Sequence, residues 1–133
     1  MSTFEPGDGA IDFNAWIEDE FARRGAFTAC VVLVEIGELS VTPLASTYLN
    51  VIGAEVDWPE IVALFTGAGM PWDGAAFFPA TAPDGGLLDN ASARTRLREI
   101  EARVKAERIA INEGFFFDRR GRRMMVEEMA RNE

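Results

Sequence analysis

The chain has 133 residues, 48% of them hydrophobic and 26% charged, and a formal net charge of −9 at pH 7. Length and composition are those of one globular domain large enough to bury its own core, and the acidic excess disfavours non-specific nucleic-acid binding. Histidine is absent and Cys30 is the only cysteine, which excludes Ser-His-Asp and Cys-His catalysis, an internal disulfide and a structural zinc site.

The N-terminal part predicts an arm and then a helix. Residues 1–10 are rich in glycine, proline and acid, so we expect a flexible arm ahead of a single domain over 11–133. A helix is expected over 14–24, with Asn14 as its N-cap and Gly25 after its end. Helical spacing separates an apolar stripe from a solvated acidic side: the apolar set is Trp16, Ile17 and Phe21, and the acidic set is Glu18, Asp19 and Glu20.

Two apolar segments follow. Residues 27–36 form a continuous run rich in β-branched side chains, which is typical of a strand buried on both faces. We therefore expect this segment to be the central strand of a sheet. Thr42 and Pro43 suit the cap and first turn of a helix over 42–52, and the apolar spacing fits a helix. A strand is the alternative for this segment.

The clearest local signal begins at Asp57. Asp57 and Glu60 have the spacing of a capping box, and Pro59 falls in the first turn, where its missing N–H costs nothing. These residues predict a helix over 57–66.

The residues after this helix predict a short strand. Asp73 and Gly74 are turn formers, and the apolar residues through Phe78 suit a strand. The stretch 79–86 is rich in proline and glycine and is expected to be a loop.

The last third predicts a long helix and a hairpin. Apolar residues at helical spacing, with pairs of acid and base four residues apart, indicate a helix from about 89 to 112. Residues 115–118 and 122–129 are strand-like, and Gly121 between them supplies the left-handed residue of a short hairpin loop.

Together these elements predict an α+β domain. We expect one mixed or antiparallel sheet of about four strands, with helices mainly on one face and the final hairpin beside the central strand. No segment is long and apolar enough to span a bilayer, and the first residues do not form a secretion signal. We therefore expect a cytoplasmic protein with no membrane partner and no cofactor. A bound metal would have to be a hard cation with oxygen ligands.

Charge is distributed unevenly along the chain. Residues 1–90 hold 14 acidic and 2 basic side chains, whereas residues 91–133 hold 8 acidic and 11 basic ones. Either the basic helix covers and neutralises the acidic part, or the two surfaces stay separate and one of them meets a partner of opposite charge.

The hairpin tip carries the densest positive charge. Four arginines surround one glycine there: Arg119, Arg120, Arg122 and Arg123. The simplest interpretation is a solvated turn that also protects an edge strand from aggregation. One alternative is docking onto an acidic protein or a phosphate. The other is nucleic-acid binding, which the neighbouring Glu127 and Glu128 and the net charge of −9 disfavour.

The middle of the chain is apolar and has no basic residue between Arg24 and Arg94. Its large side chains are candidates for a partner interface or for the lining of a ligand pocket: Tyr48, Trp58, Met70, Trp72, Phe77 and Phe78. The alternative for them is core packing. In a pocket, Glu60 or Asp73 would act as the acid or base.

The leading hypothesis is a small protein that acts by protein–protein contact, as an accessory subunit, an adaptor or a homo-oligomer. It rests on the missing catalytic side chains, the cation-poor apolar middle and the charge asymmetry. The alternative is a small-molecule-binding domain or minor enzyme with an aromatic-lined pocket and a carboxylate acid or base. A third hypothesis, an acidic mimic of nucleic acid, fits the charge of residues 1–90 but not their apolarity.

Overall fold

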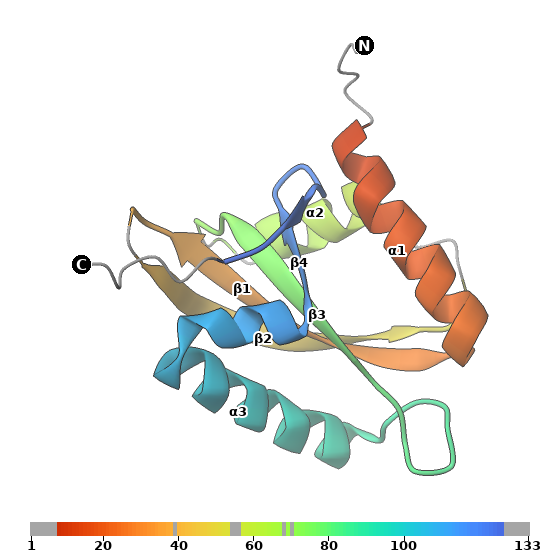
Figure 1. The fold of residues 1–133 in the computed structure, drawn as a ribbon. Coiled ribbons are helices and arrows are strands. Elements are labelled where there is room, and N and C mark those ends of the chain that lie inside the picture. The colour runs from red at the N-terminus through yellow and green to blue at the C-terminus, as the bar shows by residue number, and fades with distance from the viewer. Residues whose placement is uncertain (1–7, 39, 54–56, 68, 70, 127–133) are drawn as a thin grey trace.

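A five-stranded antiparallel sheet with the strand order β2-β1-β3-β4-β5 forms the centre of the molecule (Figure 1). The structure is a computed structural model and describes residues 8–38, 40–53, 57–67, 69 and 71–126. The strands are β1 (Phe27–Ile36), β2 (Val41–Val51), β3 (Gly74–Ala80), β4 (Phe115–Asp118) and β5 (Arg123–Met124). The predicted α+β class is confirmed, with five strands where about four were expected.

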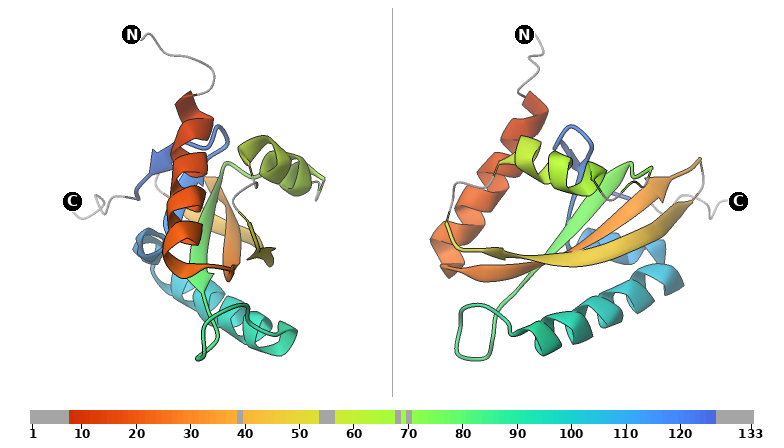
Figure 2. Two further views of the ribbon diagram at one scale, coloured as in Figure 1. Left: turned by 90° about the vertical axis from the view of Figure 1, so that its right-hand side faces the viewer. Right: turned by 180° about the vertical axis from the view of Figure 1, so that it is seen from behind.

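Helices cover both faces of this sheet. α1 (Asp8–Arg24) and α2 (Trp58–Thr66) pack on one face. α3 (Asn90–Ala106) packs on the other, and the 3₁₀ helix η1 (Arg108–Glu113) follows it. Two of the three α-helices therefore share a face, and α3 adds the third layer seen in Figure 2. None of the described helices is long and apolar enough to cross a membrane.

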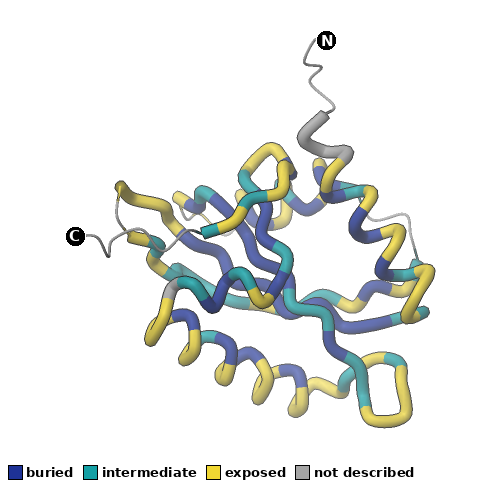
Figure 3. The backbone as a smooth tube through the Cα atoms, viewed as in Figure 1, coloured by how far each residue is buried: buried dark blue, intermediate teal, exposed yellow. Residues whose placement is uncertain are grey.

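Strand β1 connects two separate cores. Side chains alternate across a strand, so the odd-numbered residues 29–33 join the core under α1 and α2, and the even-numbered residues 30–34 join the core under α3. The first eight residues of β1 are all buried, as the dark blue of Figure 3 shows. β1 is an interior strand with a neighbour on each side, although β3 and not β1 is the middle strand of the five. Both faces of β1 are buried, as predicted, which explains its continuous apolar run.

The helix predicted over 42–52 is wrong, because this segment forms the edge strand β2. Thr42 and Pro43 resemble a helix start, but Pro43 lies in the strand beside a register irregularity at Leu33 and Val34. Proline is tolerated in edge strands and at bulges, since its missing N–H is not needed by a ladder there. Pairing with β1 along most of the strand outweighs the local helix signal.

α1 begins at Asp8, earlier than the predicted start. Asn14 lies inside the helix and does not cap it; its Oδ1 accepts a hydrogen bond from Trp58 N at 3.2 Å, which links α1 to the start of α2. Of the predicted arm, residues 8–10 are helical, and residues 1–7 lie outside the described part of the chain.

The acidic side of α1 also needs a correction. Glu18 and Asp19 are exposed as expected, but Glu20 is 0% exposed. Its carboxylate accepts hydrogen bonds from Arg23 Nη2, at 2.6 Å, and from Arg24 Nε. The two guanidinium groups compensate a charge that would otherwise be costly to bury.

α2 confirms the capping signal read from the sequence. The Asp57 side chain accepts a hydrogen bond from Glu60 N at 3.3 Å, and a proline occupies the first turn. The strand predicted after it is also confirmed, but β3 continues through Pro79 to Ala80, which were expected to belong to a loop.

The C-terminal elements differ from the prediction in length and position. α3 ends at Ala106, and 3₁₀ helix occupies most of the remaining segment to 113. At the start of α3, Ser92 N donates to Asp89 Oδ1 at 2.7 Å, and this bonding lowers the pKa of the Asp89 carboxyl. The predicted hairpin forms, but it pairs with β3 and not with β1, because β3 already occupies the second edge of β1.

Candidate functional site

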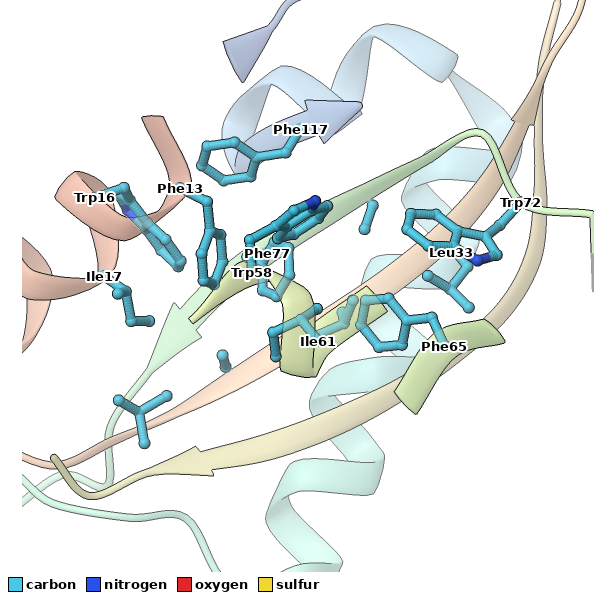
Figure 4. Packing of buried hydrophobic residues seen from close by; sticks show 14 of the residues in the cluster. Phe13, Trp16, Ile17, Leu33, Trp58, Ile61, Phe65, Trp72, Phe77 and Phe117 are labelled. Atoms are coloured by element: carbon cyan, nitrogen blue, oxygen red, sulfur yellow. The ribbon is translucent and has the colours of Figure 1, made fainter. Parts of the chain in front are cut away.

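Three of the six apolar candidates are part of the core. Trp58, Trp72 and Phe77 are each at most 3% exposed, and Figure 4 shows them among neighbouring core side chains. The Trp72 ring meets Trp58 at a centroid distance of 6.3 Å and Phe65 at 5.4 Å, both edge-to-face. Aromatic pairs of this geometry stabilise a core, so packing accounts for these three side chains without a partner or a ligand.

The other candidates lie elsewhere. Tyr48 and Phe78 pack against the core on the α3 side of the sheet, where Tyr48 Oη donates a hydrogen bond to Asn90 Oδ1 and Phe78 borders a hollow of about 40 Å³. Met70 lies outside the described residues. The five described candidates are therefore divided between the two faces of the sheet and do not line one pocket.

The two carboxylates considered as the acid or base lie at different places in the fold. Glu60 is exposed in the first turn of α2. Asp73 Oδ2 accepts a hydrogen bond from Ile36 N at 2.7 Å, and Asp73 N donates one to Val34 O at 2.8 Å. Asp73 therefore ties the end of β1 to the start of β3, which is a structural role.

The indole N–H groups distinguish the three tryptophans. Trp58 Nε1 donates to Arg119 O at 2.8 Å, whereas the N–H groups of Trp16 and Trp72 are buried without an acceptor among the described residues. An unsatisfied buried donor costs about 1–3 kcal/mol, and nothing in the described structure explains these two.

The arginine turn, which we define as residues 118–123, joins β4 to β5. Asp118 Oδ1 accepts hydrogen bonds from Arg120 N at 2.8 Å and Arg122 N at 3.0 Å. The backbone carbonyl of Asp118 accepts a third from Gly121 N at 2.9 Å. Gly121 has a φ of 82°, which only glycine adopts at little cost. The left-handed residue predicted for the hairpin loop is thus confirmed at Gly121.

Two helices hold the arginine turn in place. Trp58 Nε1, in α2, donates to the carbonyl of Arg119 at 2.8 Å. Phe13 N, in α1, donates to the carbonyl of Gly121 at 3.2 Å. Both bonds fix backbone atoms of the turn to elements far away in sequence, so tertiary contacts hold the shape of the turn.

All four arginines of the turn are exposed, and two of them lie over aromatic rings. The guanidinium carbon of Arg119 is 5.2 Å from the ring centroid of Trp72, and that of Arg123 is 4.7 Å from the ring centroid of Phe115. Such cation–π contacts orient the side chains and leave their N–H groups able to donate outward.

The Asp118 carboxylate neutralises part of this charge, because Arg122 Nε donates to its Oδ2 at 2.8 Å. The backbone N–H of Arg123 donates to Asp12 Oδ2 at 3.0 Å. Arg120 takes part in the turn through its backbone N–H and its side chain remains exposed. The turn is a net cationic surface in which Arg119, Arg120 and Arg123 have no carboxylate partner among the described ion pairs.

Two larger hollows lie on the α3 side of the molecule. One, of about 480 Å³, lies between α3 and the loop after β3, and hydroxyl side chains, Arg96 and Glu99 line it. The α3 residues that line it are all exposed, so it is an open groove without a buried polar group to orient a ligand. The other, of about 340 Å³, lies between the start of β2 and the end of α3.

Cys30 lies in the core under α3 and is fully buried. Burial raises the pKa of its thiol from 9.0, and the charge of Arg96 opposes that shift to a smaller extent. These surroundings disfavour the reactive thiolate.

We expect this thiol to make the protein less stable at alkaline pH. An unfolded thiol ionises near 9.0, but the folded one resists ionisation, so its contribution is complete below pH 9.0 and is lost as the pH rises toward the folded-state value. Urea unfolding at pH 7.5 and pH 10 should show a larger loss of stability for the wild type than for Cys30→Ala. Equal losses in the two proteins would contradict this pKa direction.

Among the described residues, no group of three or more histidine, cysteine, aspartate or glutamate side chains is arranged to hold a metal ion. The arginine turn brings four exposed arginines together on a backbone that is hydrogen-bonded to both α1 and α2. Comparison of the chain with protein-family models, curated proteins and solved structures finds no match.

Proposed function

We propose that the protein acts by protein–protein contact, as an accessory subunit or adaptor, and that the arginine turn docks onto an acidic surface of its partner. One observation supports this most: four exposed arginines stand on a turn whose backbone is hydrogen-bonded to both α1 and α2. A solvated hairpin tip needs only polar side chains, and it does not need anchoring by two helices.

Arginine suits this role for a chemical reason. Its planar guanidinium presents several donors that match a carboxylate in a bidentate manner, and it is more weakly hydrated than an ammonium group. Because Arg119 and Arg123 are already stacked on rings, less side-chain freedom is lost when they bind. Electrostatic attraction would also speed the encounter with an acidic partner, in a salt-dependent manner.

Other partners fit this surface less well. A net charge of −9 opposes association with nucleic acid, and pairing of two copies through the arginine turn would bring like charges together. A small-molecule pocket among the aromatic candidates has little support, since Trp58, Trp72 and Phe77 fill the core. A cytoplasmic location remains part of the proposal, supported by a single cysteine that is buried.

Charge reversal tests this proposal. In the double variant Arg119→Glu/Arg120→Glu, we expect affinity for the partner to fall by more than about tenfold, because attraction across the contact becomes repulsion. The partner is first identified by co-purification from native lysate with the wild type, and its affinity is then measured by calorimetry at two salt concentrations.

The matched control is Arg96→Glu/Arg103→Glu, which changes the net charge equally on exposed positions of α3. This control should retain the partner with an affinity close to that of the wild type. Equal affinity of the turn variant and the wild type would overturn the proposal, and so would the failure of the wild type to retain any partner.

A further inference from the structure

We propose that the outer edge of β2 binds an extended, acidic segment of a partner protein as an additional strand of the sheet. This surface is separate from the arginine turn, since β2 and the β4–β5 hairpin lie at opposite edges of the sheet. The inference therefore goes beyond the docking function proposed above and can fail independently of it.

β2 is a long strand with one free side. It runs from Val41 to Val51 and pairs with β1, and among the described residues no strand pairs with its other side. Figure 2 shows β2 in yellow along the rim of the sheet, uncovered by a helix at its outer edge. A free edge of this length presents a row of backbone donors and acceptors to any extended chain.

The direction of the β2 backbone groups follows from hydrogen bonds on β1. Val34 O accepts from Asp73 N, and Ile36 N donates to Asp73 Oδ2, so the even-numbered residues of β1 direct their backbone groups toward β3. Successive residues in a strand alternate in this direction. The odd-numbered residues of β1 therefore face β2, which agrees with Pro79, a residue without an N–H, lying opposite Ala29.

The register then identifies the outward groups of β2. Its residues opposite the odd positions of β1 bond inward, and its residues opposite the even positions face outward: these are Val41, Pro43, Ser46, Tyr48 and Asn50. The missing N–H of Pro43 therefore falls on the free edge, where proline is tolerated. Four N–H groups and five carbonyls remain available to an added strand.

Natural sheet edges are usually protected by charged side chains, and β2 has none. Its sequence, VTPLASTYLNV, contains no Asp, Glu, Lys or Arg. Pro43 interrupts the edge only near its start, so the segment from Ser46 to Asn50 is open to pairing. Beyond Pro43 and the register irregularity beside it, this edge has no charged side chain that would oppose pairing, which is the arrangement expected of an edge that is used.

The charge beside this edge indicates the chemistry of the added strand. Three contacts show that α3 runs antiparallel alongside β2: Asn90 bonds Tyr48, Glu101 bonds Ser46, and Lys105 borders the 340 Å³ hollow with Pro43. Positions 90, 94, 98, 101 and 105 form one stripe of a helix. That stripe contains three exposed bases, Arg94, Arg98 and Lys105, and one acid, Glu101.

The positive charge of this stripe indicates which kind of segment could pair with β2. Side chains of an added strand that point toward α3 would lie beside Arg94, Arg98 and Lys105, so acidic residues at alternate positions of the segment are complementary. A second copy of this chain, paired through β2, would instead place two basic stripes on the same side of one continuous sheet. Charge therefore favours an acidic segment of another protein over self-pairing.

The test uses a fluorescent decapeptide of alternating valine and glutamate, with a valine–lysine decapeptide as its control. Anisotropy titration should show saturable binding of the acidic peptide alone. Affinity should fall by about tenfold or more in Arg94→Glu/Arg98→Glu. It should stay near the wild-type value in Arg96→Glu/Arg103→Glu, which changes bases on the other flank of α3, and in Arg119→Glu/Arg120→Glu.

Hydrogen exchange gives the readout that is specific to strand addition. The outward amides of Ser46, Tyr48 and Asn50 should exchange faster than those of Thr47 and Leu49 in the free protein and become protected when the acidic peptide binds. Binding without this protection, equal binding to all three variants, or no saturable binding would overturn the inference. Protection that rises with protein concentration alone would assign the edge to a second copy and would equally overturn it.

Discussion

Replacing Phe77 by alanine is expected to lower the free energy of unfolding by about 3–5 kcal/mol, the range of large-to-small changes at a buried aromatic position. Phe77 is 1% exposed and stands where α1, α2 and β4 meet the sheet. Its ring lies 5.3 Å from that of Phe13 and 5.9 Å from that of Phe117, measured between centroids. Alanine would leave a cavity and would remove the ring contacts of Phe77 with Phe13 in α1, Trp58 in α2 and Phe117 in β4.

The neighbouring residue supplies a matched control. Phe78 has the same side chain on the same strand, but it faces α3 and is only partly buried. Phe78→Ala should therefore cost about 1–2 kcal/mol, less than half the effect at Phe77, because less apolar area leaves water on folding. Urea unfolding followed by tryptophan fluorescence measures both values. Equal costs at the two positions would contradict the expected dependence on burial.

The elements that the sequence predicted well depend on residues close to one another in the chain. The capping pair of Asp57 and Glu60 sets the start of α2 through a contact three residues long. Residues 27–36 needed only their own continuous apolarity to indicate a buried strand. Gly121 likewise carries the left-handed turn by itself.

The wrong helix prediction at β2 arises because contacts between residues distant in the sequence decide the structure of this segment. Thr42 and Pro43 have real preferences for a helix start, and the apolar spacing to Ile52 fits a helix. What decides the structure is the ladder to β1, which pairs positions as distant as Phe27 and Val51. A local pattern cannot reveal such a ladder, and a proline reads as a strand residue only when the strand is known to be an edge.

The candidate sites, too, have some features that local composition reveals and others that depend on tertiary contacts. The composition of the hairpin tip was enough to single out the four arginines, but not their anchoring, which comes from Phe13 and Trp58 at distant positions. Composition alone also could not tell a buried aromatic cluster from an exposed one. Trp72 and Phe77 belong to the core because α2 covers them, and that placement follows from tertiary packing.

Removing the two arginines at the end of α1 is the second change with a large expected effect. The double variant Arg23→Ala/Arg24→Ala should lower the free energy of unfolding by about 3 kcal/mol, because a buried charge without its partners is costly. Glu20 is 0% exposed, and both of its described ion-pair partners would be gone. The second ion pair of Arg23, with Asp19, is exposed on both sides and contributes little.

Substitution of Glu20 itself tests whether the cost comes from leaving its charge buried without a partner or from losing the attraction of the ion pairs. Glu20→Met removes the buried charge, and the exposed guanidinium groups return to water, so its cost should stay within about 1 kcal/mol. Added to Arg23→Ala/Arg24→Ala, the same substitution should restore most of the lost stability, which gives a large coupling energy in a double-mutant cycle measured by urea unfolding. If Glu20→Met alone cost as much as the loss of both arginines, the ion pairs themselves would be stabilising α1. In that case the burial of Glu20 would contribute to the stability of the fold, and the arginines would not merely compensate for it.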